Sequence, residues 1–259
     1  MSEYVPVVTA SYAYRVAVAE LPLRTRLSDD PAGAVVVVDG GSEWCDKVSD
    51  SLAAGARAII VARPSTASAD ELAALVARAG DRAIVLERPF LRPDAVTDAV
   101  TARRAADAQA RARLVAADCA AASNDFAAAL RDSIGWLRGL SGGALVLRTG
   151  GNGVGLFDSR EADGVPAVLT AVRAGGTSRL RIRALGEAVS EVDVSIARAL
   201  VTTSTAGGRS TAPERFETPQ RLALRRAIDA MTADAQIEDV AEFAADSTLA
   251  AAVIAPRGA

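Results

Sequence analysis

The chain has 259 residues, of which 50% are hydrophobic and 24% are charged, a composition typical of a globular protein. A net charge of −3 gives no indication of the basic surface that binding to nucleic acid or an anionic membrane would require. Two cysteines are too few for a disulfide framework or a cysteine-rich metal site. The N-terminus MSEYVPVV lacks a signal peptide's features, and no apolar run approaches a membrane span, so we expect a cytoplasmic protein.

The basic residues are unusual in type. The sequence contains no histidine, and Lys47 is its one lysine, so arginine supplies the remaining 28 of 29 basic residues. Histidine and lysine are the commonest general bases, and histidine is the commonest metal ligand. Any catalysis would therefore need another base, and no metal site is predicted.

The first third of the chain alternates short apolar runs with helical patterns. VPVVTAS reads as a first strand, and RVAVAE reads as a second strand that ends at Glu20. The expected elements that follow are a strand over 34–38, a helix over 43–54, a strand over 58–61, a helix from the Ser68–Glu71 capping box to Gly80, and a strand over 83–87. This alternation predicts a parallel, doubly wound sheet with right-handed crossovers.

The pattern changes after Pro93. We expect helices over 94–118 and 124–138, and then glycine-broken β segments over 144–205 that are typical of a mostly antiparallel sheet. The string TGGNGVG at 149–155 has the wrong spacing for a phosphate loop and predicts a hairpin turn. Helices from Thr218-Pro219 to about residue 232 and over 236–254 would cover one face of that sheet. The predicted domains are 1–92, an α/β domain, and 93–259, an α+β domain.

Four stretches in this order resemble one family. They are LSDDPAGAVVVVDGG, LAAGARAIIVARPSTASADELAALVARAG, NDFAAALRDSIGWLRGLSGG and IEDVAEFAADSTLAAAVIA. Their order and spacing resemble the glucose–fructose oxidoreductase/inositol dehydrogenase (Gfo/Idh/MocA) family over about residues 28–255. The resemblance implies a Rossmann-like domain joined to an open-sheet α+β domain, and NAD(P)-dependent chemistry on sugars and cyclitols.

The resemblance places the family's catalytic residues on specific positions here. Its Glu-Lys-Pro lysine falls on Arg63, its Asp-x-x-x-His pair on Asp125 and Ala129, and the aspartate three residues further on falls on Asp132. Positions 125, 129 and 132 lie on one helix face. Arg63, Asp125 and Asp132 are therefore the catalytic candidates. Each also has a structural interpretation: Arg63 as a strand-end arginine paired with an acid, Asp125 as a helix cap, and Asp132 as a core residue.

Three further residues match the family's substrate region. Arg88 and Arg92, in LERPFLRP, fall on the family's arginine-rich segment beside the pocket, and Trp44 falls near a family histidine. They are the substrate-binding candidates. The alternatives are a solvated surface for the arginines and a core or interface position for the tryptophan.

Two parts of the family's machinery are missing. Deprotonating an arginine at pH 7 costs about 7.5 kcal/mol, so Arg63 cannot replace the lysine as a base. No glycine lies in residues 1–32, so the Gly-x-Gly-x-x-Gly turn that holds the pyrophosphate is absent, and we expect the segment to be too short for a full crossover helix. We therefore predict no bound cofactor.

Three hypotheses follow from different functional classes. The first is a degenerate, non-catalytic subunit that pairs with itself or with an active homologous oxidoreductase through the 144–205 sheet. The second is a functioning oxidoreductase that uses NAD or NADP, with its site completed by a partner chain. The third is a module that binds a sugar or sugar acid without turnover. Fold alone cannot choose among them.

Overall fold

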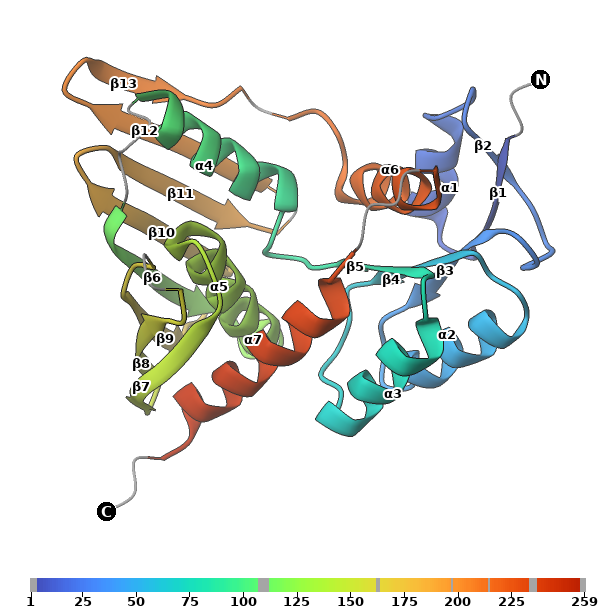
Figure 1. Cartoon of the computed structure of the whole chain (residues 1–259), viewed down its shortest axis with the longest axis horizontal. Coiled ribbons are helices and arrows are strands. Elements are labelled where there is room, and N and C mark those ends of the chain that lie inside the picture. The colour runs from blue at the N-terminus through green and yellow to red at the C-terminus, as the bar shows by residue number, and fades with distance from the viewer. Residues whose placement is uncertain are drawn as a thin grey trace. The chain divides into compact units, whose positions relative to one another are not determined.

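The structure is a computed structural model that describes residues 4–106, 112–161, 164–196, 198–213, 215–232 and 237–256 (Figure 1). It divides into two compact units. The first unit comprises Met1–Arg88 and Arg215–Ala244, and the second comprises Pro89–Glu214 and Ala245–Ala259. The first boundary lies close to the predicted one, but 215–244 groups with the first unit rather than with 93–214. None of the described helices is long and apolar enough to span a membrane.

The first unit is built on a parallel sheet, as predicted. Its strands have the order β2-β1-β3-β4-β5, and every neighbouring pair is parallel. The elements are β1 (Val5–Val8), α1 (Tyr12–Ala19), β2 (Thr25–Leu27), β3 (Val35–Asp39), α2 (Trp44–Ala53), β4 (Ala58–Ala62), α3 (Ala69–Ala79), β5 (Ala83–Glu87) and, much later, α6 (Pro219–Thr232). The predicted capping box of Ser68 and Glu71 is confirmed at the start of α3.

Each face of this sheet has its own core. Val36, Val38, Ile59 and Val61 pack in a core with α2 and α3, whereas the alternate positions of the same strands pack in a core with α1 and α6. Figure 1 shows these two helix pairs on opposite sides of the sheet. Burial on both faces explains why the strands are uninterrupted apolar runs.

The N-terminal prediction is wrong in one element. Residues 12–19 form the helix α1 and not a strand, and Glu20 is the cap residue that ends it. Tyr14, Ala17 and Val18 are its buried residues, and their spacing of three and four places them on one helix face. A helix of only eight residues therefore makes the crossover between β1 and β2, and the expectation that the segment is too short for a crossover helix is wrong.

The second unit contains an eight-stranded sheet, mostly antiparallel as predicted. The strand order is β13-β12-β11-β10-β6-β9-β8-β7, with one parallel pair, β6 and β9. The elements are α4 (Pro93–Ala106), β6 (Ala112–Ala121), α5 (Phe126–Ser141), β7 (Leu145–Gly151), β8 (Val154–Ser159), β9 (Ala167–Arg173), β10 (Arg179–Gly186), β11 (Val189–Ser195), β12 (Arg198–Thr205) and β13 (Gly208–Thr211).

The expectation of helix over 94–118 is wrong in its second half. Helix α4 ends at Ala106, and Ala112–Ala121 is the strand β6 in the middle of the sheet. Val115, Ala117, Cys119 and Ala121 are buried and alternate with less buried residues, a period of two. Pairing with β10 on one side and β9 on the other overrides the helix propensity of alanine.

Helices of the second unit pack on this sheet. Leu169, Leu180, Ile182, Val192 and Val194 lie in the core that includes α5 and the end of α7 (Asp239–Ile254). Helix α4 contacts β11 and β12. The prediction that 217–232 covers this sheet is wrong, because α6 packs on β4 and β5 of the first unit.

The TGGNGVG string forms a hairpin turn, as predicted. Strands β7 and β8 pair antiparallel around Asn152 and Gly153, which both have positive φ angles. The N–H groups of these two residues donate to the carbonyls of Ala255 and Val253, at 3.1 and 3.0 Å. The turn therefore satisfies backbone carbonyls left free at the end of α7.

Candidate functional site

The carboxyl ends of the parallel strands form the candidate site in the first unit. Strand β1 lies between β2 and β3. The chain passes from β1 to its neighbour β2 on one side and then crosses to β3 on the other side of β1, so the strand order reverses there. In open α/β sheets, ligands bind beside the carboxyl ends of strands at such a reversal of strand order. The residues that follow these ends are Thr9 after β1, Asp39 and Gly40 at β3, and Arg63 after β4.

The loops that follow β3 and β4 are locked together. Gly40 N–H donates to the Ala62 carbonyl at 2.8 Å, and Ser65 N–H donates to the Gly40 carbonyl at 2.7 Å. The Ser65 hydroxyl donates to the Gly41 carbonyl at 3.0 Å. A Cβ atom on Gly40 would lie 2.5 Å from the carbonyl oxygens of Ala62 and Arg63, so only glycine fits at this close approach.

Arg63 occupies an unusual backbone conformation within this lock. Its φ is 55°, in the left-handed region, and its N–H donates to the Glu87 carbonyl at 2.9 Å. Arginine rarely adopts this conformation, and such outliers cluster at functional sites. The side chain is exposed, and among the described residues no ion pair joins it to an acid. The charge of Arg63 does act on the buried carboxyl of Glu87, and the interpretation of Arg63 as a strand-end arginine paired with an acid stays a prediction.

Glu87, at the carboxyl end of β5, is buried among hydrogen-bond donors. Its carboxyl accepts from the Tyr14 hydroxyl of α1 at 2.5 Å and from the Gln220 amide of α6 at 2.7 Å. Burial raises the pKa of the Glu87 carboxyl above its ordinary value, and the two hydrogen bonds and the charge of Arg63 oppose that rise only in part. Glu87 thus joins β5 to both helices on this face.

The raised pKa of Glu87 predicts how stability depends on pH. The Glu87 carboxyl binds its proton more tightly in the folded chain than in the unfolded chain, where its pKa is near 4.5. This carboxyl therefore contributes less to stability as pH rises through and above that value. We expect Glu87→Gln to be more stable relative to wild type at about pH 7 than at about pH 4. Urea unfolding at several pH values measures the difference. The exposed Glu43→Gln is the control, and a parallel pH response of the two variants would contradict the prediction.

The predicted substrate-binding residues lie in structural contacts. Trp44 is buried, donates from Nε1 to the Ser65 carbonyl at 3.2 Å, and meets the Phe243 ring edge-on. Buried Arg88 places its guanidinium carbon 6.0 Å from the centre of the same ring. In the second unit, buried Arg92 pairs with Asp94 at 2.7 Å. Substrate contact by these three residues stays a prediction.

The predicted carboxylates lie in the second unit, at the start of and within α5. Asp125 is half-buried, does not cap the helix with its side chain, and accepts from the Ser178 hydroxyl at 2.7 Å. Asp132 is fully buried and accepts from the Phe90 N–H at 2.9 Å and from Arg131 at 3.2 Å. These contacts agree with the structural interpretation of Asp132, and catalysis by either residue stays a prediction.

The turn from β1 to α1 lacks the glycines of a dinucleotide-binding turn. A pyrophosphate binds where glycines let it approach free N–H groups at the helix start. Here Thr9, Ala10 and Ser11 form the turn, and the Ser11 N–H donates to the Thr9 hydroxyl at 3.1 Å. The turn contains no glycine, and the Ser11 N–H at the start of α1 already has a partner.

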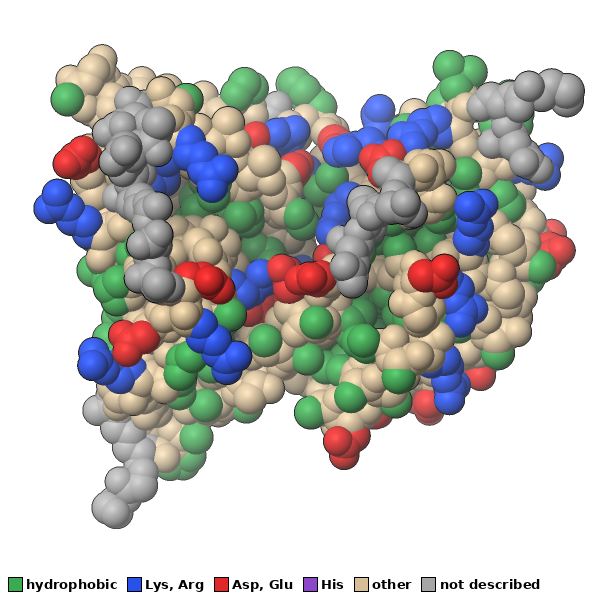
Figure 2. Space-filling view, in the orientation of Figure 1, with side chains coloured by type: hydrophobic (Ala, Val, Ile, Leu, Met, Phe, Trp, Pro, Cys, Tyr) green, Lys and Arg blue, Asp and Glu red, His purple; other side chains and the backbone are tan. Residues whose placement is uncertain are grey.

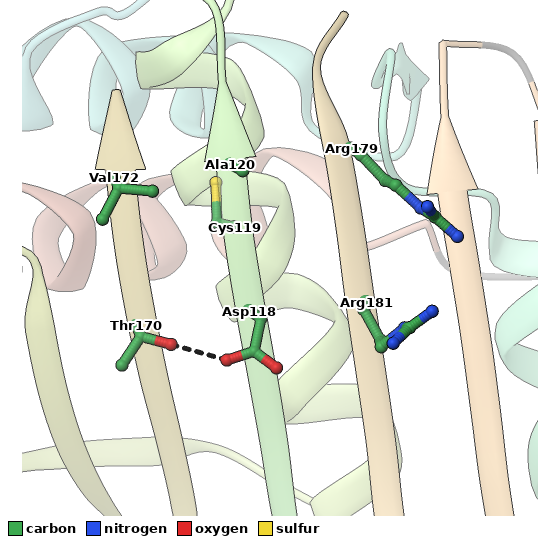
Figure 3. Close-up of a pocket in the computed structure, with 7 residues that line it drawn as sticks. All are labelled: Asp118, Cys119, Ala120, Thr170, Val172, Arg179 and Arg181. Atoms are coloured by element: carbon green, nitrogen blue, oxygen red, sulfur yellow. Dashed lines mark hydrogen bonds between the residues drawn. The ribbon is translucent and has the colours of Figure 1, made fainter. Parts of the chain in front are cut away.

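A hollow lies on the sheet of the second unit. It has a volume of about 410 Å³ and is lined by Asp118, Cys119, Ala120, Thr170, Val172, Arg179 and Arg181 (Figure 3). Asp118 accepts from the Thr170 hydroxyl at 2.6 Å and from Arg183 at 2.9 Å. Arg179 and Arg181 both pair with Asp193. Charges of both signs are also interspersed over the view in Figure 2.

The sequence analysis did not single out Asp39, Glu87, Tyr14 or Gln220. Asp39 and Glu87 carried a signal, because each is an acid that directly ends a buried apolar strand. Tyr14 and Gln220 carried none, because they reach Glu87 from positions 73 and 133 residues away.

Comparison with known proteins gives structural neighbours alone. No protein-family model matches the chain, and no curated protein matches it significantly. A UDP-N-acetylglucosamine 3-dehydrogenase, GnnA from Acidithiobacillus ferrooxidans, is similar with a TM-score of 0.67 and 14% identity over 98% of this chain and 97% of that chain. KijD10, a 3-ketoreductase from Actinomadura kijaniata solved with TDP-benzene and NADP, has a TM-score of 0.61 and 14% identity over 98% and 97%.

A third neighbour, the dehydrogenase MviM from Clostridium difficile, has a TM-score of 0.64 and 9% identity over 96% of this chain and 89% of that chain. All three are oxidoreductases of the type that the sequence resembles, and the similarity covers both units. The chain therefore has the two-part fold of the Gfo/Idh/MocA-type oxidoreductases.

Proposed function

We propose that this chain is a catalytically degenerate Gfo/Idh/MocA oxidoreductase-like protein that serves as a non-catalytic subunit. The observation that carries the proposal is the turn from β1 to α1, where Thr9, Ala10 and Ser11 replace a glycine-rich phosphate turn. Hydride transfer depends on the nicotinamide cofactor, and the protein's first task is to bind and orient it. A chain that does not hold the cofactor lacks that step.

The residue at the lysine position supports the same conclusion. Arg63 stays protonated at neutral pH, because deprotonating it costs about 7.5 kcal/mol, so it cannot accept a hydroxyl proton. The acid Glu87 interacts electrostatically with Arg63, but its carboxyl is buried and both of its oxygens are hydrogen-bonded. Glu87 therefore does not act as an exposed base in the lysine's place.

We expect the isolated chain to show no measurable binding of NAD(H) or NADP(H) by calorimetry. The physical reason is the β1–α1 turn, which lacks the glycines that let a pyrophosphate approach the backbone N–H groups at the start of a helix. Folding of the sample is checked by the thermal unfolding transition. A dissociation constant below about 100 μM would overturn the proposal and favour the functioning oxidoreductase.

The subunit role is proposed from the uncovered sheet face of the second unit. Val172, Leu156 and Leu200 are among its exposed apolar residues, at 58%, 43% and 37%, and they lie among the pairs that Arg179, Arg181 and Arg183 make with acids. In the part of the chain that is described, α4 and α5 pack on this sheet. Along β9 the exposed residues alternate with buried residues, which lie on the face that α5 covers. A mixed apolar and charged face suits another copy of this chain or an active homologous subunit.

We expect the isolated chain to sediment as a dimer at micromolar concentration, with more than about 1,000 Å² buried at the interface. Val172→Asp should shift the equilibrium toward monomer, because a charge replaces an exposed apolar contact. Val76→Asp, on an exposed position of α3, is the control. A single species near 26.6 kDa at every concentration would remove the homo-oligomer and leave the partner-dependent form.

A further inference from the structure

Strand β2 forms an open edge of the parallel sheet in the first unit. It ends the strand order and pairs with β1. The Val5 N–H donates to the Arg24 carbonyl at 2.9 Å. The Ser28 N–H donates to the Val7 carbonyl at 3.0 Å, so alternate residues of β2 face β1. Leu27 therefore directs its N–H and its carbonyl away from the sheet, and neither group has a hydrogen-bond partner within the described part of the chain.

The opposite edge of the same sheet is covered. Strand β5 ends the strand order on that side, and its Leu86 N–H donates to the Asp239 carboxylate at 2.9 Å. Helix α6 also packs on β5. Proteins cover or block sheet edges because free backbone groups there pair with other strands. The Leu27 side chain, by contrast, is 52% exposed, so β2 offers its backbone groups to a further strand.

The segment around Leu27 is complementary in charge to a second copy of itself. Residues 24–30 read RTRLSDD, with two arginines before Leu27 and two aspartates after it. When two such segments lie antiparallel about a two-fold axis at Leu27, the basic half of each lies beside the acidic half of the other. A parallel pair in register would place like charges opposite one another, which is destabilising. The charge pattern therefore favours one partner in one orientation.

We propose that β2 pairs with β2 of a second copy of this chain, antiparallel and centred on Leu27. The Leu27 N–H of each copy donates to the Leu27 carbonyl of the other, as in a hydrogen-bonded pair of an antiparallel ladder. The two leucine side chains lie next to one another across the axis. Arg26 of each copy reaches diagonally toward Asp30 of the other. The two parallel sheets then join into one continuous sheet.

This surface lies on the first unit and is separate from the sheet face of the second unit proposed above for the subunit role. A pair of three-residue strands buries less than the area of about 1,000 Å² that a stable interface needs. We therefore expect weak pairing, with a dissociation constant above about 100 μM. Such pairing adds to the dimer expected at micromolar concentration and does not depend on it.

Disulfide cross-linking of the full chain tests the proposal, with Val172→Asp included to weaken the other interface. In the proposed pair the two Cα atoms at position 27 lie about 5.5 Å apart, within disulfide range. At about 200 μM under mild oxidation, we expect Leu27→Cys to give at least about fivefold more linked dimer than Leu23→Cys. Leu23 is the control because it is 79% exposed but would lie about 20 Å or more from its own copy. Cys45 and Cys119 are buried, and the chain without a new cysteine checks that they stay unlinked.

Charge exchange tests the orientation of the pair. Added to Leu27→Cys, the changes Arg26→Asp and Asp29→Arg should each lower the yield about threefold or more, because like charges then face one another. Asp29 is chosen because the Asp30 carboxylate also accepts from the Ala32 N–H at 2.9 Å. An equal mixture of the two variants should restore the yield as a dimer with one copy of each, identified by its mass.

Three results would overturn the proposal. They are no linked dimer through position 27, equal linking through positions 23 and 27, and a yield that the charge variants do not change. The thermal unfolding transition of each variant checks that it is folded. Monomeric sedimentation of the wild-type chain at micromolar concentration would contradict the dimer through the second unit without affecting this result.

Discussion

Replacing Gly40 by alanine is expected to lower the free energy of unfolding by about 2–4 kcal/mol. The new Cβ would lie 2.5 Å from two backbone carbonyl oxygens, those of Ala62 and Arg63, and backbone cannot turn aside as a flexible side chain can. Relief of this clash would separate the loops after β3 and β4 and weaken the hydrogen bonds of Gly40 with Ala62 and Ser65. The same movement would release the left-handed backbone of Arg63.

Urea unfolding followed by circular dichroism measures this change, with the transition midpoint lowered and its slope retained. Gly41→Ala is the matched control, because its Cβ would make an ordinary contact of 3.4 Å with the Asp39 side chain. We expect the Gly41 variant to stay within about 1 kcal/mol of wild type. Equal midpoints for the two variants would show that the loops are not locked as described.

Replacing Gly153 by alanine is expected to have an effect of similar size, about 3 kcal/mol. Gly153 has a φ of 82°, and a Cβ atom there would lie 2.3 Å from the Ala171 carbonyl oxygen on β9. The variant would therefore carry backbone strain and lose close contact with β9. It would also disturb the 3.0 Å hydrogen bond to the Val253 carbonyl at the end of α7.

The control for Gly153 lies in the same unit. Gly175 has no atom within 4 Å of the position of a Cβ and no left-handed φ, so Gly175→Ala should leave the unfolding midpoint unchanged or slightly raised. Hydrogen exchange of the last turn of α7 is a second measurement, because the Gly153 variant should lose protection there. A Gly153 variant as stable as the Gly175 variant would contradict the assigned role of the hairpin.

The sequence by itself determined the elements that depend on local chemistry. The buried runs that became β3, β4 and β5 are apolar on both faces, and the Ser68–Glu71 box satisfies the first turn of α3 within four residues. The glycine-rich turn at 152–153 is likewise local, because its backbone needs positive φ angles. The replacement of a family lysine by Arg63 and the absence of glycine before residue 33 are also plain in the sequence.

Only the tertiary structure decided which surfaces these elements cover. Helix α6 has an apolar face that would suit either sheet, and its packing on β4 and β5, with Gln220 hydrogen-bonded to Glu87, assigns it to the first unit. The alanine-rich β6 is a strand because two neighbouring strands supply its hydrogen bonds. The left-handed backbone of Arg63 depends on hydrogen bonds between separate loops and strands. Such pairings join residues distant in sequence, and no local pattern encodes them, because their stability arises only when the chain has folded.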